Sequence, residues 1–242
     1  NQGDAINWGL KLGAAVEHMG AYQGHGSVAT PHGALITWAI MMEGGIQLNS
    51  AGKRFSNEHE GYSEQSLKVL QQPNGIAWNI FDERLHQLGL EFEDYRVAVS
   101  NGAVKSFASI DKLAAYIDVS AEIISSSIED IKAFKDGKKK CPFGRNFEHT
   151  SVLKGPPYYG VKVTGALFHT QGGLLVDTEA RVLRQDSSVI PGLFAAGGAA
   201  VGVSGTGVEG YLSGNGLLMA VSLGYLAGQS AAKSVRNKKR PE

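Results

Sequence analysis

The order of apolar and polar positions divides the chain into a helical start, a mixed middle and a strand-rich end. Apolar residues recur near helical spacing from Ile6 to Met19, behind a possible N-cap at Asp4, and predict an opening helix. The stretches 46–48 and 53–55 flank a glycine-containing turn, which favours a hairpin. The start of the chain is therefore expected to hold one long helix and one hairpin.

A strand and two helices are predicted in the middle of the chain. Residues 76–81 have the apolar and aromatic composition of a strand. Ser109 and Ser120 stand where N-caps are expected, ahead of helical patterns over 111–117 and 121–134. These elements predict that residues 28–150 form an α+β unit inserted into the chain, and that the segments before and after it fold together.

Past residue 151 the pattern changes to short segments of strand character, followed by a glycine-rich loop and a long apolar helix. The expected strands cover residues 158–164, 166–170, 174–176, 181–183 and 193–196. The final helix is expected over 217–235. Its apolar stripe is predicted to be buried in a core and comprises Leu217, Leu218, Val221 and Leu226.

Composition excludes several classes of protein. The chain has 242 residues with 23 Lys+Arg and 23 Asp+Glu, so its charge points to neither nucleic acid nor a membrane surface. The uncharged stretch 189–208 is broken by Pro191 and several glycines, so it is not a membrane span. The single cysteine, Cys141, excludes an internal disulfide and a cysteine-based zinc site, and no His or carboxylate pair has metal-ligand spacing. With no signal peptide recognised, a cytoplasmic setting is expected.

Glycine is enriched, at 32 residues, and many of these glycines lie between positions 197 and 216. The predicted strand 193–196 leads into this loop, and the loop leads into the final helix. Backbone N–H groups at such a junction can face an anion or a carbonyl oxygen. The spacing alone favours a ligand site, with tight packing of helix on sheet as the alternative.

Several short motifs stand in a definite order along the chain. They are Gly3-Asp4, Gly52-Lys-Arg-Phe-Ser-Asn-Glu58, His169-Thr-Gln-Gly-Gly173, Val189-Ile-Pro-Gly-Leu-Phe-Ala-Ala-Gly-Gly198, Gly214-Asn-Gly216 and Gly224-Tyr-Leu-Ala-Gly228. In this order they resemble the C-terminal half of the fumarate reductase/succinate dehydrogenase flavoprotein superfamily. That superfamily includes soluble fumarate reductases, tricarballylate dehydrogenases and 3-ketosteroid dehydrogenases.

The resemblance implies FAD as the cofactor and an α+β fold. Residues 1–27 and 151–242 would be the C-terminal strands and helix of a Rossmann-like FAD-binding domain, and residues 28–150 an inserted substrate-capping domain. The chain is accordingly expected to be a fragment, whose partner is the missing N-terminal FAD-binding half of the same protein. The cofactor contacts carried over from the family are Asp4, His169, Gly172, Gly173, Gly198, Asn215, Gly216 and Leu217.

Two residues are carried over as catalytic. Arg54 stands at the arginine of the family's G-x-R-F-x-N-E motif, which in fumarate reductases delivers the proton while flavin N5 delivers hydride. The alternative is that Arg54 only pairs with Glu58 or Glu60. Tyr211 stands where fumarate reductases carry a carboxylate-binding arginine and 3-ketosteroid dehydrogenases a tyrosine that hydrogen-bonds the ketone. The alternative for Tyr211 is packing under the glycine loop.

The substrate positions carried over are His25, Thr37 and Phe168. Phe168 and His169 match the two histidines of the motif His-His-Thr-Met-Gly-Gly, so an aromatic ring replaces the substrate-gripping histidine. Trp38 and Met41 stand where the reductases carry a carboxylate and a guanidinium of the proton relay. A dicarboxylate buried against these groups would leave charge unpaired, so fumarate is not the expected substrate.

The resemblance therefore implies an FAD-dependent oxidoreductase acting on CH–CH bonds of a small-molecule substrate. Hydride would move between flavin N5 and a carbon next to an activating carbonyl of an apolar or cyclic substrate. Three alternatives remain open. They are a fumarate reductase-like reduction of an unsaturated carboxylic acid, a non-catalytic fragment unable to hold flavin, and a carboxylate- or nucleotide-binding protein without redox chemistry.

Overall fold

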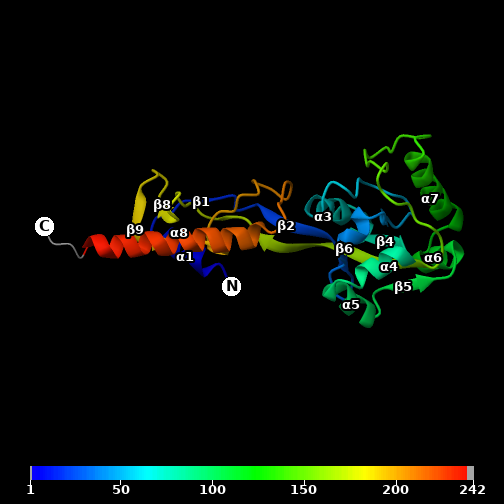
Figure 1. Cartoon of the computed structure of the whole chain (residues 1–242), viewed down its shortest axis with the longest axis horizontal. Helices are drawn as coiled ribbons and strands as arrows, with labels where there is room; N and C mark the ends of the chain where they lie inside the picture. The colour runs from blue at the N-terminus through cyan, green and yellow to red at the C-terminus, as the bar shows by residue number, and fades with distance from the viewer. Residues whose placement is uncertain (1, 239–242) are drawn as a thin grey trace. The chain divides into compact units, whose positions relative to one another are not determined.

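The computed structural model describes residues 2–238 and divides into two folding units (Figure 1). The chain passes between the units along two strands. The central unit comprises residues 24–166, and the terminal unit comprises the residues up to 23 and from 167 onward. Strands β2 (Tyr22–Ala29) and β6 (Tyr158–Thr170) run through the two boundaries. The assignment of residues 1–27 and 151–242 to an FAD-binding domain, and of 28–150 to a capping domain, stays a prediction.

The central unit is built on a sheet in which β6 and β4 lie in the middle. The strand order is β2-β6-β4-β3, and β5 also pairs with β6. The remaining strands of this sheet are β3 (Ile46–Leu48), β4 (Ile76–Asp82) and β5 (Lys105–Phe107). β4 is antiparallel to both β3 and β6, with Ile80 opposite Ile46 on one side and Gly160 on the other.

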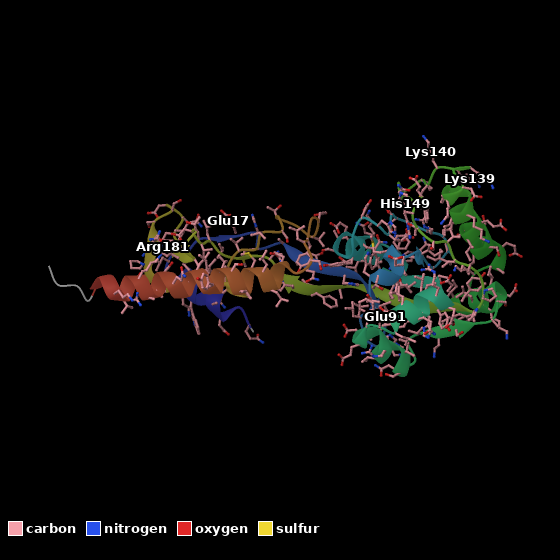
Figure 2. All side chains as sticks on the ribbon, in the orientation of Figure 1. Glu17, Glu91, Lys139, Lys140, His149 and Arg181 are labelled. Atoms are coloured by element: carbon pink, nitrogen blue, oxygen red, sulfur yellow. The ribbon has the colours of Figure 1, made fainter. Side chains whose placement is uncertain are left out.

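Short helices surround this sheet and enclose one large apolar core. They are α2 (Ala39–Met42), α3 (Tyr62–Leu70), the 3-10 helix η1 (Pro73–Gly75), α4 (Glu83–Gly89), α5 (Glu93–Ser100), α6 (Ile110–Ile117) and α7 (Ala121–Lys135). The predicted cap of α6 is confirmed, because the Ser109 hydroxyl accepts a hydrogen bond from the Lys112 amide at 3.3 Å. Beyond α7, Lys140 extends into solvent, whereas Lys139 forms an ion pair with Asp130 of α7 at 2.7 Å (Figure 2).

The predicted hairpin is wrong, although its turn is present. The Asn49 amide donates to the Lys53 carbonyl at 2.9 Å, but β3 pairs with β4 and residues 53–55 form no strand. Ile46 and Leu48 are fully buried where β3 pairs with β4. Burial of apolar side chains between segments distant in sequence therefore determines which strand β3 pairs with. The helices α4 and α5 and the strand β5 were not predicted.

The terminal unit has a smaller core and only short strand pairs. β1 (Val16–Glu17) is antiparallel to β7 (Gly173–Leu174), and β8 (Arg181–Leu183) is antiparallel to β9 (Val189–Phe194). Its helices are α1 (Asp4–Lys11), the 3-10 helix η2 (Gly197–Ala199) and α8 (Asn215–Lys238). The predicted strands 158–164 and 166–170 are one continuous strand, β6.

The opening helix is shorter than predicted. It ends at Lys11, the following turn contains Gly13 at a φ of 82°, and Val16 already lies in β1. The prediction of Asp4 as the N-cap is also wrong. Gly3 is the cap residue, and Asp4 is the first helical residue, where its carboxylate lies at the positive end of the helix dipole.

Of the apolar stripe predicted to be core, Leu226 is half-buried, and the other three residues are exposed within the described chain. Leu217, Leu218 and Val221 are 77%, 59% and 71% exposed. Among the described residues, α8 packs on η2 and β9, with Leu223 against the small core, so most of its circumference has no covering layer. No helix within residues 2–238, including the 24-residue α8, is long and apolar enough to cross a membrane.

Candidate functional site

The terminal unit contains a cavity of about 480 Å³ that gathers several predicted site residues. Its wall comes from the start of α1, the end of β6 and the glycine turn after β9. The lining residues are Gly3, Ile6, Met19, Leu167, Phe168, His169, Thr170, Gly172 and Gly198. Positions far apart in sequence thus meet around one space, and they include four residues predicted to bind cofactor or substrate.

Glycines shape this cavity in two different ways. A Cβ at Gly172 would lie 2.5 Å from the Met19 Cα, and a Cβ at Gly173 would lie 2.3 Å from the Ala200 carbonyl carbon. These two positions therefore need glycine because backbone packs on backbone. A Cβ at Gly198 would meet no heavy atom within 4 Å. Gly198 consequently borders open space, as expected where a flat ligand approaches the chain.

A chain of buried polar side chains lies behind the cavity. Gln171 Nε2 is 2.8 Å from His169 Nδ1, and Asn215 Nδ2 donates to Gln171 Oε1 at 2.8 Å and to Ser204 Oγ at 2.6 Å. Asn215 is 2% exposed, and its Oδ1 is buried without a hydrogen-bond partner. An acceptor left unmatched in this way is a place where a cofactor N–H can be received. Sequence reasoning missed Gln171 and Ser204, although Gln171 lies inside a motif that had been recognised.

The other predicted residues of the terminal unit do not line this cavity. Asp4 is exposed in the first turn of α1, and Leu217 is exposed on α8. Tyr211 is half-buried in the loop before α8. Gly216 lies next to His169, since a Cβ built there would be 3.2 Å from His169 Nε2.

In the central unit, Arg54 belongs to a buried ion cluster. Its Nε and Nη2 donate to the two oxygens of Glu58 at 2.8 and 2.5 Å, and Arg145 Nη1 lies 3.1 Å from the same carboxylate. The side chains of Arg54, Glu58 and Arg145 are 6%, 1% and 0% exposed. The ion pair named as the alternative for Arg54 is present with Glu58, whereas Glu60 pairs with Lys68.

The cluster keeps its groups ionised despite burial. Burial alone would lower the pKa of Arg54, but hydrogen bonds and charge from Glu58 outweigh it and raise that pKa above its ordinary value. Burial alone would raise the pKa of Glu58, and the two guanidiniums lower it instead. Arg145, which sequence reasoning missed, also donates to the Gly45 and Met41 carbonyls at 2.9 and 3.0 Å.

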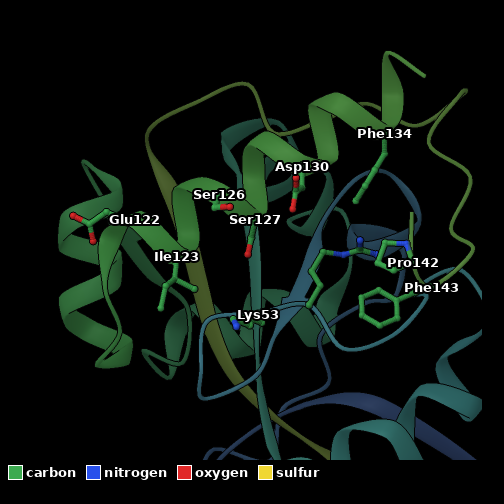
Figure 3. A pocket seen from close by; sticks show the side chains of 10 residues that line it. Lys53, Glu122, Ile123, Ser126, Ser127, Asp130, Phe134, Pro142 and Phe143 are labelled. Atoms are coloured by element: carbon green, nitrogen blue, oxygen red, sulfur yellow. The ribbon is translucent and has the colours of Figure 1, made fainter. Parts of the chain in front are cut away.

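A second cavity, of about 410 Å³, lies beside Arg54 in the central unit (Figure 3). One face of α7 supplies Ile123, Ser127 and Phe134 to one wall, and Lys53 and Phe143 lie across from them. The Arg54 guanidinium is 5.6 Å from the ring centroid of Phe143. The wall is therefore mostly apolar, and its charged groups are the cations Lys53 and Arg54 and the carboxylates Glu122 and Asp130.

His25 and Thr37 lie elsewhere in the central unit. His25 is 6% exposed, stacks on Tyr62 with ring centroids 5.0 Å apart, and meets the edge of Trp38 at 5.8 Å. Burial lowers the pKa of His25 to about 4, so the ring is neutral at physiological pH. Thr37 is half-buried, while Trp38 and Met41 are in the apolar core. The two positions of the family's proton relay thus serve packing in this chain.

Within the described part of the chain, no group of three or more His, Cys, Asp and Glu side chains is placed to hold a metal ion. The sequence model of a family described as FAD binding domain matches residues 1–217. This chain belongs to that FAD-binding family. The match confirms FAD as the predicted cofactor, and the cavity beside Gly198 and the unmatched Asn215 oxygen fit such a group.

Similar proteins include both kinds of enzyme that the sequence motifs resembled, fumarate reductases and 3-ketosteroid dehydrogenases. The fumarate reductase (cytochrome) of Shewanella frigidimarina is 29% identical over 231 residues, which are 96% of this chain and 39% of that protein. The 3-oxosteroid 1-dehydrogenase of Mycobacterium tuberculosis is 28% identical over 265 residues, covering 94% of this chain and 46% of that protein. The solved open conformation of a flavocytochrome c3 fumarate reductase matches with a TM-score of 0.70 at 28% identity, over 96% of this chain and 40% of that chain.

These matches confirm the predicted flavoprotein relationship and the predicted mixed helix-and-strand fold class of an FAD-binding protein. The chain spans less than half the length of these relatives. The roles of individual site residues stay predictions. Arg54 and His25 belong to the central unit, whereas Phe168 and Tyr211 belong to the terminal unit.

Proposed function

We propose that this chain is part of an FAD-dependent oxidoreductase acting on CH–CH bonds. Hydride moves between flavin N5 and a carbon next to an activating carbonyl of an apolar or cyclic substrate. The observation that carries the proposal is the terminal-unit cavity, where Phe168, His169 and Gly198 line one space in a chain of the FAD-binding family. Bound FAD supplies the centre that gives or accepts the hydride.

The chain's own residues bind and position. His169, Gly198 and the Asn215 oxygen hold the cofactor, the glycine by leaving the backbone open to close approach. Tyr211 donates a hydrogen bond to the substrate ketone and stabilises negative charge that develops on its oxygen. Arg54 exchanges the proton with substrate carbon, and Glu58 holds its guanidinium in one orientation.

An apolar or cyclic substrate is favoured by the groups at the predicted substrate positions. His25 is neutral at physiological pH because burial lowers its pKa to about 4, and Phe168 has no charge. Neither can offset a substrate carboxylate. Reduction of an unsaturated carboxylic acid is the second candidate, as in the fumarate reductase relatives. A setting in the cytoplasm stays a prediction.

The partner that completes the FAD site is proposed to be an N-terminal part of the same protein. The chain covers only 39% of the first fumarate reductase relative, so such relatives have additional sequence. The stripe formed by Leu217, Leu218 and Val221 is exposed on α8, which is what a helix needs to pack on a further sheet layer.

The test is made on the full-length protein, purified and examined for flavin absorbance. Anaerobic bleaching of that absorbance is then screened with cyclic ketones in both oxidation states and with unsaturated acids. We expect yellow protein that responds to cyclic ketones, and Tyr211→Phe with turnover at least about tenfold lower and flavin retained. The matched control is Tyr116→Phe, an exposed tyrosine of the central unit, which should keep full turnover. Colourless full-length protein contradicts the proposal and supports a non-catalytic role.

A further inference from the structure

We propose that Gln171 is a positioning residue of the flavin site, which fixes His169 in the tautomer with its proton on Nε2. The inference rests on the proposed FAD site of the terminal unit. It concerns a residue that stands where the resembled motif His-His-Thr-Met-Gly-Gly has methionine. Methionine offers no N–H group, so a hydrogen bond from this position to the histidine is a property of the present sequence.

The hydrogen-bond pattern of Gln171 determines the state of the histidine. Gln171 is 2% exposed, and its Oε1 accepts from Asn215 Nδ2 at 2.8 Å. Its Nε2 therefore faces His169 Nδ1, at 2.8 Å, and an amide nitrogen only donates. His169 Nδ1 must accept that hydrogen bond with its lone pair. In the neutral ring the proton then resides on Nε2.

The direction of this chain of amides is set by its surroundings. Asn215 Nδ2 donates to Ser204 Oγ at 2.6 Å as well as to Gln171, so both its hydrogens are used and only its Oδ1 is left unmatched. Turning both amides around would bury an NH₂ group in place of that single oxygen, which leaves more donors unpaired. The Gly202 backbone also lies against Gln171 Oε1, because a Cβ built on Gly202 would be 2.1 Å from that oxygen. In this orientation Gln171 Oε1 can accept the weak Cα–H contact from Gly202, which an NH₂ group in its place could not accept.

The Nε2 atom of His169 lies against the first turn of α8. A Cβ on Gly216 would be 3.2 Å from Nε2, so the ring edge faces the first turn of α8. His169 itself lines the cavity together with Gly198 and Phe168. The fixed Nε2–H is thus a donor for an oxygen or nitrogen acceptor of the isoalloxazine ring, at a helix end whose dipole also favours negative charge.

The experiment compares wild type, Gln171→Glu and Gln171→Met in the full-length protein. The first readout is the protonation of the His169 ring nitrogens, from nitrogen-15 NMR of histidine-labelled protein freed of flavin, with His169→Gln to assign the signal. The second is the dissociation constant of FAD. Gln171→Glu keeps the side-chain shape and the bond from Asn215 but replaces the donor with an acceptor. Gln185→Glu and Gln185→Met, in the exposed turn between β8 and β9, are the matched controls.

We expect His169 to carry its proton on Nε2 in wild type and on Nδ1 in Gln171→Glu. The dissociation constant of FAD should rise about 3- to 10-fold in Gln171→Met, the equivalent of one ordinary hydrogen bond, and stay unchanged in both controls. A wild-type ring protonated on Nδ1, or Nε2 protonation alone in Gln171→Glu, overturns the inference. Flavin affinity equal in wild type and in Gln171→Met overturns it too. Wild-type protein that binds no FAD refutes the proposed function, and the tautomer measurement, made without flavin, still decides the role of Gln171.

Discussion

Replacing Glu58 with glutamine should strongly destabilise the central unit. Two guanidiniums and one carboxylate leave this buried cluster with a net charge of +1, and the substitution raises it to +2. Glu58 is 1% exposed and accepts from Arg54 at 2.5 and 2.8 Å, from Arg145 at 3.1 Å and from the Gln47 amide at 3.2 Å. Breaking a buried pair by removing one partner costs about 3–5 kcal/mol, because the remaining charge stays buried. The wild-type stabilisation is present above the ordinary pKa of Glu58 and is lost as the pH falls through its lowered value.

Amide hydrogen exchange of β4, followed by mass spectrometry of the full-length protein, measures this free energy within the central unit. A loss of about 3 kcal/mol or more accelerates exchange of β4 at least about 100-fold at neutral pH. Glu60→Gln is the control, because Glu60 is 40% exposed in its ion pair with Lys68 and should cost less than about 1 kcal/mol. Equal exchange rates in Glu58→Gln and Glu60→Gln would refute the reasoning.

Three further predictions test other parts of the fold. Burial lowers the pKa of His25 from 6.5 to about 4. The free energy of unfolding of the central unit should therefore be unaffected by this group above pH 6.5 and should fall by about 3 kcal/mol as the pH drops from 6.5 to about 4. His25→Phe should flatten that pH dependence of exchange in the central unit, and an unchanged slope would contradict this origin. Gly173→Ala should lower the stability of the terminal unit by about 1–3 kcal/mol, because the added Cβ overlaps the backbone of Ala200. Gly198→Ala should leave the melting temperature unchanged and weaken FAD binding. Equal melting temperatures for the two variants would argue against the packing role of Gly173. Ser109→Ala should cost about 1 kcal/mol by removing the cap of α6, read as faster exchange of that helix, and an unaltered rate would show the cap to be dispensable.

The sequence alone was sufficient where a local signal coincides with the final structure. The cap at Ser109 and the strand beginning at Ile76 depend on neighbouring residues, and both are present. The ordered glycine motifs were sufficient for the FAD-binding family, because close backbone approach demands glycine at positions such as Gly173. Local chemistry of this kind is visible one segment at a time.

Other features required the folded chain, because they depend on partners distant in sequence. Residues 53–55 looked like a hairpin strand, but Ile46 gains more burial against β4. The apolar face of α8 predicted a core, yet Leu217 is exposed because no described element covers it. Helical periodicity predicts that one face of a helix is apolar, but it does not identify the element that packs against that face.

The candidate site shows the same division. Motif position alone selected His169 and Arg54 as candidates. Only the tertiary structure brought Asn215 to Gln171, which lies two residues after His169, and Arg145 to Glu58 across a long span of sequence. Hydrogen bonds and ion pairs between distant segments leave no periodic trace in a sequence, because their geometry exists only after the chain has packed.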